Sequence, residues 1–275
     1  MGDWDGAGGQ GADSGAVAPL LELRGVSLRF GGVQALREVG FALQRGALFS
    51  IIGPNGAGKT SLLNCISGRY QPSAGSVHFQ GREITRLRPH QRAARGIGRT
   101  FQNLALFGHM TVLDNIMVGR HHLLAKGFAA GMAYWFGGAQ REELAHRRRV
   151  EEIIDFLEIE SIRREMAATL PYGLRKRVEL ARAVALEPAL LLLDEPMAGM
   201  NLEEKEDMAR YIVELNEEWG IAVLMIEHDM GVVMDISQRV VVLDFGRKIA
   251  EGAPAEIMAD PAVRAAYLGE DGAAA

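Results

Sequence analysis

Hydrophobic and polar residues follow three different patterns along the chain. From residue 20 to residue 52, short runs alternate between apolar and polar positions, as in LLELRGVSLRF and VGFAL, and end in the apolar run ALFSII. From about residue 111 to residue 186 the apolar spacing becomes helical and charges crowd in, as in REELAHRRRVEEIIDFLEIESIRRE. After Pro188 the apolar runs ALLLLDEP, IAVLMIEH and RVVVLDFG appear, the first two separated by the helical segment LEEKEDMARYIVELNEEWG. Alternation predicts strands, and the order strand, helix, strand predicts a parallel sheet.

Local signals refine this α/β arrangement. A helical pattern begins at Lys59 and stops at Gly68, a residue type that commonly ends helices, and SVHFQGREI at 76–84 has the pattern of a small hairpin. One sheet is predicted to start near Ala47 and to resume near Ala189. The helical segment between these positions, at about residues 103–187, is therefore predicted to be an inserted subdomain. The charged run HRRRVEE within it is typical of a solvated helix face.

Composition narrows the classes of protein. The 275 residues are 48% hydrophobic and 24% charged, which is the balance of a soluble globular protein. The net charge of −5 gives no global basic footprint, so no nucleic-acid partner is predicted. Cys65 is the single cysteine, which excludes a disulfide within the chain and leaves a zinc cluster short of sulfur. A reducing cytosol fits this composition, with Cys65 buried on a helix.

The sequence indicates neither a secretory signal nor a membrane-spanning segment. Residues 1–18 are rich in Gly, Ala and Asp, carry no Lys or Arg, and are predicted to form a disordered acidic tail rather than a secretory signal. The longest uncharged aromatic stretch, GFAAGMAYWFGGAQ at 127–140, is shorter than the ~20 apolar residues that a bilayer requires. A role at a membrane would therefore be that of a peripheral subunit.

The segment GPNGAGKTS at 53–61 matches the phosphate-binding pattern G-x-x-x-x-G-K-[ST] between an apolar strand and a helix. Its glycines let successive backbone N–H groups face an anion, and the helix N-terminus adds partial positive charge. Lys59 is expected to reach the β- and γ-phosphates, and the Thr60 hydroxyl to ligate Mg²⁺. The predicted nucleotide-binding residues of this loop are Gly53, Pro54, Asn55, Gly56, Ala57, Gly58, Lys59, Thr60 and Ser61.

Two carboxylates follow the apolar run Leu190–Leu193. The C-terminal ends of parallel strands form the ligand-binding edge of such a sheet, so Asp194 and Glu195 are expected there. Asp194 suits the Mg²⁺ shell, and Glu195 suits a general base that activates water. A lone acidic pair could also be a solvated strand end, but here a phosphate-binding loop precedes it.

With these motifs, the chain from Leu20 to Glu270 resembles the nucleotide-binding subunit of an ATP-binding cassette (ABC) transporter. The resemblance implies a RecA-like P-loop NTPase core over residues 19–255, with an antiparallel β subdomain and the inserted helical subdomain. It implies that Phe30 stacks on adenine and that Gln102 in RTFQN contacts metal and water and couples ATP to the membrane subunit. His228 in LMIEHDM resembles the switch histidine that touches the γ-phosphate. Without the family, Phe30 is as readily a core residue and His228 as readily structural.

Two further loops resemble elements through which paired subunits communicate. AGMN at 198–201 resembles such a loop and makes Asn201 a predicted dimer contact. LPYGL at 170–174 stands where the family signature LSGGQ belongs: Leu170 and Gly173 match, whereas Pro171, Tyr172 and Leu174 depart. In the family this loop covers the γ-phosphate held by the other subunit of a head-to-tail dimer. Proline has neither a hydroxyl nor an N–H, so a heterodimer whose partner carries a complete signature is favoured.

Within the family, the chain most resembles importers of branched-chain amino acids and related amides. The shared features are a signature of the L-x-Y-G type, an AG-x-N loop, IEHDM, and a tail like DPAVRAAYLGE within residues 256–275. The resemblance implies ATP and Mg²⁺ as cofactors and ATP hydrolysis that energises uptake. It also implies integral membrane permease subunits, a second ABC ATPase, an indirect link to a periplasmic solute-binding protein, and a place on the cytoplasmic face of the inner membrane.

Three alternatives remain beside the importer. The lipopolysaccharide-export ATPase shares a YLGED ending but resembles LSGG and AG-x-D more closely. Non-transport cassette ATPases usually carry two cassettes, long coiled coils or zinc cysteines, and the sequence has none of these. A regulator that binds without turnover has no need of Glu195. The transported solute, the direction of transport beyond the resemblance, and homodimer against heterodimer stay open.

Overall fold

The structure is a computed structural model that describes residues 18–100, 105–121, 123 and 138–271. The predicted tail at 1–18 and the aromatic stretch at 127–140 lie largely outside these residues, and Gln102 lies outside them as well.

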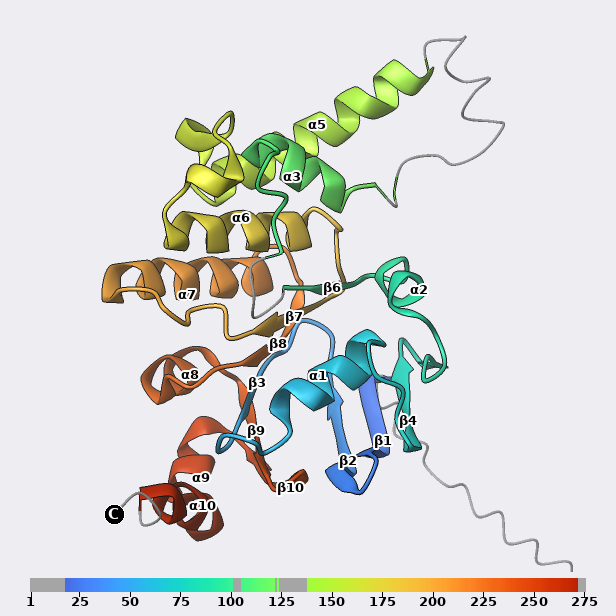
Figure 1. Ribbon diagram of the computed structural model, residues 1–275, viewed down its shortest axis with the longest axis vertical. Helices are drawn as coiled ribbons and strands as arrows, with labels where there is room; N and C mark the ends of the chain where they lie inside the picture. The colour runs from blue at the N-terminus through green and yellow to red at the C-terminus, as the bar shows by residue number, and fades with distance from the viewer. Residues whose placement is uncertain (1–17, 101–104, 122, 124–137, 272–275) are drawn as a thin grey trace, which may run out of the picture.

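A six-stranded sheet forms the centre of the molecule (Figure 1). Its neighbouring strands are parallel, except for the antiparallel pair at one edge. In spatial order the strands are β10 (Arg247–Gly252), β9 (Arg239–Asp244), β3 (Leu48–Ile52), β8 (Ala222–Ile226), β7 (Leu190–Asp194) and β6 (Ile97–Arg99).

The apolar runs of the sequence are explained by burial on both faces of this sheet. On β7, Leu190 and Leu192 enter the core shared with α1, while Leu191 and Leu193 enter the core below the helical subdomain. Because successive side chains of a strand point to opposite faces, a sheet covered on both sides needs continuous apolar runs. The predicted parallel sheet is confirmed.

A four-stranded antiparallel sheet covers one side of the core. Its spatial order is β2 (Val33–Leu43), β1 (Leu21–Phe30), β4 (Ala74–Phe79) and β5 (Arg82–Glu83). The pairing of β4 with β5 confirms the predicted hairpin. Helix α1 (Lys59–Ser67) packs in one hydrophobic core with both sheets, and it ends at Gly68 with φ 83° as predicted. Cys65 is buried on this helix.

Helices stack on the opposite side of the central sheet, where Figure 1 shows α7 between the sheet and the helices of the inserted subdomain. Two short 3-10 turns connect helices within the inserted subdomain. Three helices that follow β8 along the chain cover the end of the sheet formed by β9 and β10. The bounds of the remaining helices are α2 (Pro89–Ala93), α3 (Val112–Gly119), α5 (Gly138–Phe156), η1 (Glu160–Ile162), η2 (Ala167–Thr169), α6 (Tyr172–Val184), α7 (Leu202–Glu217), α8 (Met230–Ile236), α9 (Pro254–Ala259) and α10 (Pro261–Asp271).

One sequence expectation about the sheet was incomplete. The sheet does not pass from β3 directly to β7, because the edge strand β6 at Ile97–Arg99 comes first along the chain and pairs with β7. Three residues with a central glycine are too short to show an alternating pattern. Among the described residues, no helix is long and apolar enough to cross a membrane.

Candidate active site

The phosphate-binding loop connects β3 to α1 and adopts the conformations that its glycines permit. Gly53 has φ 142°, and a Cβ there would lie 2.0 Å from the carbonyl oxygen of Leu243. Gly58 has φ 99° and directly precedes α1, whose first turn carries no side-chain cap and no acidic residue. The N-terminal N–H groups of α1 therefore face the loop with the polarity that favours an anion.

A cavity of about 500 Å³ lies above this loop. It is lined by the loop, by the start of β2, and by residues that follow the ends of β7, β8 and β9. These residues are Val33, Gln34, Ala35, Arg37, Asn55, Gly56, Ala57, Gly58, Lys59, Thr60, Ser61, Glu195, His228, Phe245 and Gly246. The structure thus brings the predicted loop, Glu195 and His228 to one cavity.

Lys59 lies over the loop. Its Nζ donates hydrogen bonds to the carbonyl oxygens of Gly53 (2.6 Å) and Pro54 (2.9 Å), and the residue is only 7% exposed. The ammonium group is therefore held at the cavity floor, where phosphate oxygens can become its acceptors.

Asp194 contacts Thr60 of the cavity lining but is not itself a lining residue. The Thr60 hydroxyl lies 3.5 Å from Oδ1 of Asp194, and Arg99 lies 3.2 Å from Oδ2. Burial raises the pKa of Asp194, and the positive charge of Arg99 opposes that rise. Since the ionised carboxylate is costly here, a bound cation would stabilise it.

These oxygens fit Mg²⁺. The described residues contain no group of three or more His, Cys, Asp or Glu that could hold a metal by themselves. Mg²⁺ is usually bound by one or two protein oxygens together with substrate phosphates and water. One carboxylate and one hydroxyl beside a phosphate-binding loop meet that requirement.

Glu195 and His228 form a close pair at the mouth of the cavity. Glu195 follows β7 and His228 follows β8, and these strands are parallel neighbours in which Asp194 pairs with Ile226. Oε1 of Glu195 lies 2.5 Å from Nε2 of His228. Glu195 adopts φ 52°, which turns its backbone sharply at the strand end. A carboxylate in this position, oriented by an imidazole, can accept a proton from an attacking water.

Glu227 supports this pair and was not predicted from the sequence. Its buried carboxylate accepts backbone hydrogen bonds from Met197 (2.8 Å) and His228 (3.1 Å). Burial raises its pKa, and the two backbone donors oppose that rise. Glu227 thereby joins the segment after Glu195 to the segment that carries His228. The one sequence signal was an acid at the end of an apolar strand.

The signature segment at 170–174 packs against other parts of the same chain, and a glycine lies at each of two contacts. Gly173 lies in the first turn of α6 against the Glu204 carboxylate, which a Cβ on Gly173 would meet at 2.1 Å. A Cβ on Gly199 of the AGMN loop would lie 3.2 Å from the ring of Tyr172. Tyr172 therefore packs on the second loop predicted to serve communication between subunits, and its departure from the family pattern has a structural consequence.

The other signature positions differ in exposure. Pro171 is exposed and precedes α6 without a side-chain cap, Leu170 is buried, and Leu174 is half-buried against the helical core. Lys176, one turn into the helix, donates to the carbonyl oxygen of Glu195 at 3.4 Å. This contact, missed in the sequence, joins the signature helix to the backbone of the proposed base.

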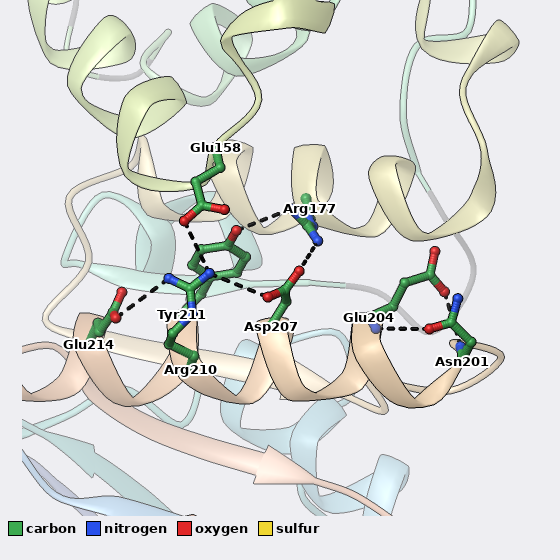
Figure 2. A network of polar contacts seen from close by, with 8 residues as sticks. All are labelled: Glu158, Arg177, Asn201, Glu204, Asp207, Arg210, Tyr211 and Glu214. Atoms are coloured by element: carbon green, nitrogen blue, oxygen red, sulfur yellow. Dashed lines mark hydrogen bonds and ion pairs between the residues drawn. The ribbon is translucent and has the colours of Figure 1, made fainter.

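Figure 2 shows how α7 is attached to the helical subdomain above it. Arg177 of α6 contacts Asp207 and the hydroxyl of Tyr211, and Arg210 contacts Glu158 at 3.1 Å. These ion pairs fix α6, and with it the signature segment, over α7.

Asn201 has a local structural role (Figure 2). Its Oδ1 accepts the backbone N–H of Glu204 (2.9 Å), and Oε2 of Glu204 accepts the N–H of Asn201 (3.0 Å). This reciprocal capping box begins α7 and satisfies two of its N-terminal donors.

Phe30 pairs with Val33 of the cavity lining but is not itself a lining residue. Its ring packs edge-on against Tyr70, with a centroid distance of 5.0 Å, and the residue is 46% exposed. The exposed part of the ring leaves room for a stacking partner, so the adenine contact stays a prediction.

The fold and the cavity define an ATP-binding cassette ATPase: a P-loop, an Asp-Glu pair and a histidine meet at the ends of three parallel strands, below an inserted helical subdomain. The family model described as "ABC transporter" matches residues 36–198, and one described as "Branched-chain amino acid ATP-binding cassette transporter" matches residues 247–273. The chain belongs to the ABC transporter family.

Relatives cover nearly the whole chain. The "high-affinity branched-chain amino acid transport ATP-binding protein BraF" of Pseudomonas aeruginosa is 41% identical over 92% of this chain and 98% of its own length. The LivG protein of the same description from Escherichia coli K12 is 39% identical with the same coverage. The crystal structure of a nucleotide-free ATP-binding cassette from an ABC transporter has a TM-score of 0.78 and 30% identity, covering 90% of this chain and 98% of its own. These likenesses confirm the predicted fold class and family.

Proposed function

We propose that the protein is the ATP-hydrolysing subunit of an importer for branched-chain amino acids or related amide solutes. The observation that carries the proposal is the similarity to BraF and LivG over 92% of the chain. It extends into the C-terminal segment, where residues 247–273 match the branched-chain model. That segment lies beyond the nucleotide site, so its similarity adds information about subgroup rather than about ATP binding.

The proposed roles of the site residues follow the geometry. The P-loop from Gly53 to Ser61 cradles the phosphates, and Lys59 supplies charge to them. Thr60 and Asp194 would hold Mg²⁺, which would neutralise charge on the phosphates. Gln102, which the family resemblance implies as a further metal ligand, lies outside the described residues. Glu195 accepts the proton of the attacking water, and His228 orients that carboxylate at 2.5 Å.

The proposed division of the chain is an acidic tail at 1–18, the ATPase over 19–255 with its helical subdomain at about 103–187, and a family tail at 256–275. Helices α3, α5 and α6 between β6 and β7 support the position of the insertion.

A groove of about 610 Å³ is the proposed contact with the permease. It lies between the end of α1, α2, β6, α3 and α6, and none of the described residues that line it is acidic. Its polar groups are mostly cationic or imidazole: Arg69, His90, Arg99, His121 and Arg182. The complementary occupant is a cytoplasmic permease segment with apolar side chains and a carboxylate. The proposed location of the subunit is therefore peripheral, on the cytoplasmic face of the inner membrane, with the solute-binding protein on the other side.

A second ABC ATPase completes the proposed assembly, as a heterodimer. Pro171 offers no donor at the signature position, and the Gly173 turn already lies against the Glu204 carboxylate of its own chain. A partner with a complete signature would supply the donors that this chain lacks. Equal ATP turnover at both sites of a purified homodimer would contradict the heterodimer.

Purification of the complex from native membranes tests the import function. We expect integral permease subunits and a second ATPase to accompany the chain, and the complex in proteoliposomes with its binding protein to take up leucine or a related solute on ATP addition. Export of a lipid-linked saccharide would favour the lipopolysaccharide-type alternative. Purification of the chain without any membrane subunit would favour a non-transport ATPase.

Replacing Phe30 by alanine is expected to weaken ATP affinity about 5- to 160-fold, since a stacked base contributes about 1–3 kcal/mol. Turnover at saturating ATP and Mg²⁺ should remain. Calorimetric titration of ATP measures the affinity, and Phe107→Ala, which removes a similarly exposed ring from the helical side, is the control. Unchanged affinity in Phe30→Ala would remove Phe30 from the site.

A further inference from the structure

Arg99 lines the proposed permease groove, but the proposed roles in ATP binding and hydrolysis do not use it. It ends β6, and its side chain is 9% exposed. Burial lowers its pKa, and the neighbouring Asp194 carboxylate opposes that shift. Burying a guanidinium costs free energy unless it is paired and hydrogen-bonded, so the contacts of Arg99 indicate what the side chain does.

The first contact of Arg99 is with the proposed metal ligand. Nη2 lies 3.2 Å from Oδ2 of Asp194, while Oδ1 of the same carboxylate lies 3.5 Å from the Thr60 hydroxyl. The guanidinium thus engages one carboxylate oxygen and leaves the other directed at the second proposed metal ligand. Outer-shell hydrogen bonds of this kind orient ligating carboxylates.

The second contact is with the helix that begins at the phosphate-binding loop. Nη1 of Arg99 donates to Oδ1 of Asn64 (2.7 Å) and to the hydroxyl of Ser67 (2.6 Å). Both acceptors lie in the C-terminal half of α1, whose first residues are Lys59 and Thr60. Arg99 therefore connects Asp194 on β7 to the helix that carries the other metal-site residue.

The third feature is the position of Arg99 on the lining of the groove. Arg99 lines the groove, and its partner Asp194 contacts Thr60, which lines the nucleotide cavity. A carboxylate that enters the groove would compete with Asp194 for the same guanidinium.

We infer that Arg99 is a positioning residue that orients Asp194 for metal binding and transmits occupancy of the groove to the metal site. The orienting role depends only on contacts within this chain. The transmitting role rests on the proposed function, since it requires a permease segment in the groove.

The orienting role is tested on the isolated full-length chain with Mn²⁺ as the probe. Mn²⁺ affinity in the presence of a non-hydrolysable ATP analogue is measured by electron paramagnetic resonance. We expect Arg99→Ala to weaken Mn²⁺ binding about 10- to 100-fold, the range for loss of an outer-shell partner. Arg99→Lys, which keeps the charge but cannot reach Asp194 and α1 together, should lie between wild type and Arg99→Ala.

Two comparisons separate orientation from general damage. Nucleotide affinity without metal should change less than threefold in both variants, because the loop contacts of Lys59 do not involve Arg99. Arg95→Ala removes an exposed arginine that lies outside the groove and contacts the Gln91 carbonyl, and its Mn²⁺ affinity should match wild type. Wild-type Mn²⁺ affinity in Arg99→Ala, or an equal loss of metal-free nucleotide affinity, would overturn the orienting role.

The transmitting role is tested on the assembled complex in lipid nanodiscs. Mn²⁺ affinity of the wild-type chain should differ at least threefold between the isolated and assembled states, and this difference should vanish in Arg99→Lys. An equal difference in wild type and Arg99→Lys would overturn the transmitting role. If no permease complex forms, the proposed function fails, whereas the result on the isolated chain still decides the orienting role.

Discussion

Replacing Glu195 by glutamine is expected to lower steady-state ATP turnover of the assembled complex by about 10²- to 10⁴-fold, the usual contribution of a general base. Glutamine keeps the size of the side chain and one oxygen acceptor but cannot take up the proton of the attacking water. Because Oε1 of Glu195 lies 2.5 Å from Nε2 of His228, an amide in this place can still contact the imidazole. The loss should therefore fall on the chemical step.

ATP affinity should change little in this variant. The phosphate contacts are expected from the loop between β3 and α1 and from Lys59 at the start of α1, whereas Glu195 follows β7. Phosphate release measures turnover, and titration of ATP measures binding. Glu217→Gln, an exposed position at the end of α7, makes the same chemical change away from the cavity and should retain wild-type turnover. Unchanged turnover in Glu195→Gln would assign the base to another group.

Contiguous motifs explain why much of the site could be predicted from the sequence. The glycines of the P-loop determine its conformation, and Asp194 and Glu195 can be recognised because they directly follow an apolar run. His228 needed the family resemblance, because a single histidine after a strand has no pattern of its own. The structure adds the pairing of β7 with β8 that brings it to Glu195.

The residues that the sequence did not reveal act through contacts between distant segments. Arg99 reaches Asp194 across 95 positions, and Lys176 reaches the Glu195 carbonyl across 19. Both are basic residues that composition alone would place on the surface. Strand β6 was missed for a related reason, since its pairing with β7 is what makes three residues a strand. Local pattern predicts elements well, and tertiary contacts decide which charges are buried.

Arg92 is more deeply buried than Arg99 or Lys176, and its replacement is expected to have the largest effect on stability. The residue is 1% exposed and lies on the short helix α2. Its guanidinium donates to four carbonyl oxygens: Cys65 (2.6 Å), Ile66 (2.7 Å), Thr85 (2.8 Å) and Leu87 (3.0 Å). Two of these belong to the last turn of α1, whose carbonyls have no partner within the helix. Arg92 thus caps the helix that begins at the phosphate-binding loop.

The space for this side chain depends on Gly68, where a Cβ would lie 2.7 Å from Nε of Arg92. Glycine at this position therefore both ends α1 at φ 83° and admits the guanidinium. Burial lowers the pKa of Arg92 to about 10, so the group remains charged at neutral pH. The four acceptors of the guanidinium are all carbonyl oxygens, so the loss of any one of them removes part of the stabilisation of the charge.

Arg92→Ala is expected to lower the free energy of unfolding by about 3–5 kcal/mol, because it leaves buried carbonyls without donors and opens a cavity. Arg92→Lys should lose less, since an ammonium can reach one or two of the four oxygens. Urea unfolding of the isolated chain measures both values. Arg95→Ala, in which an exposed arginine loses one contact with the Gln91 carbonyl, should change stability by less than about 0.5 kcal/mol. Equal stability of Arg92→Ala and Arg95→Ala would mean that the last turn of α1 is satisfied without the guanidinium.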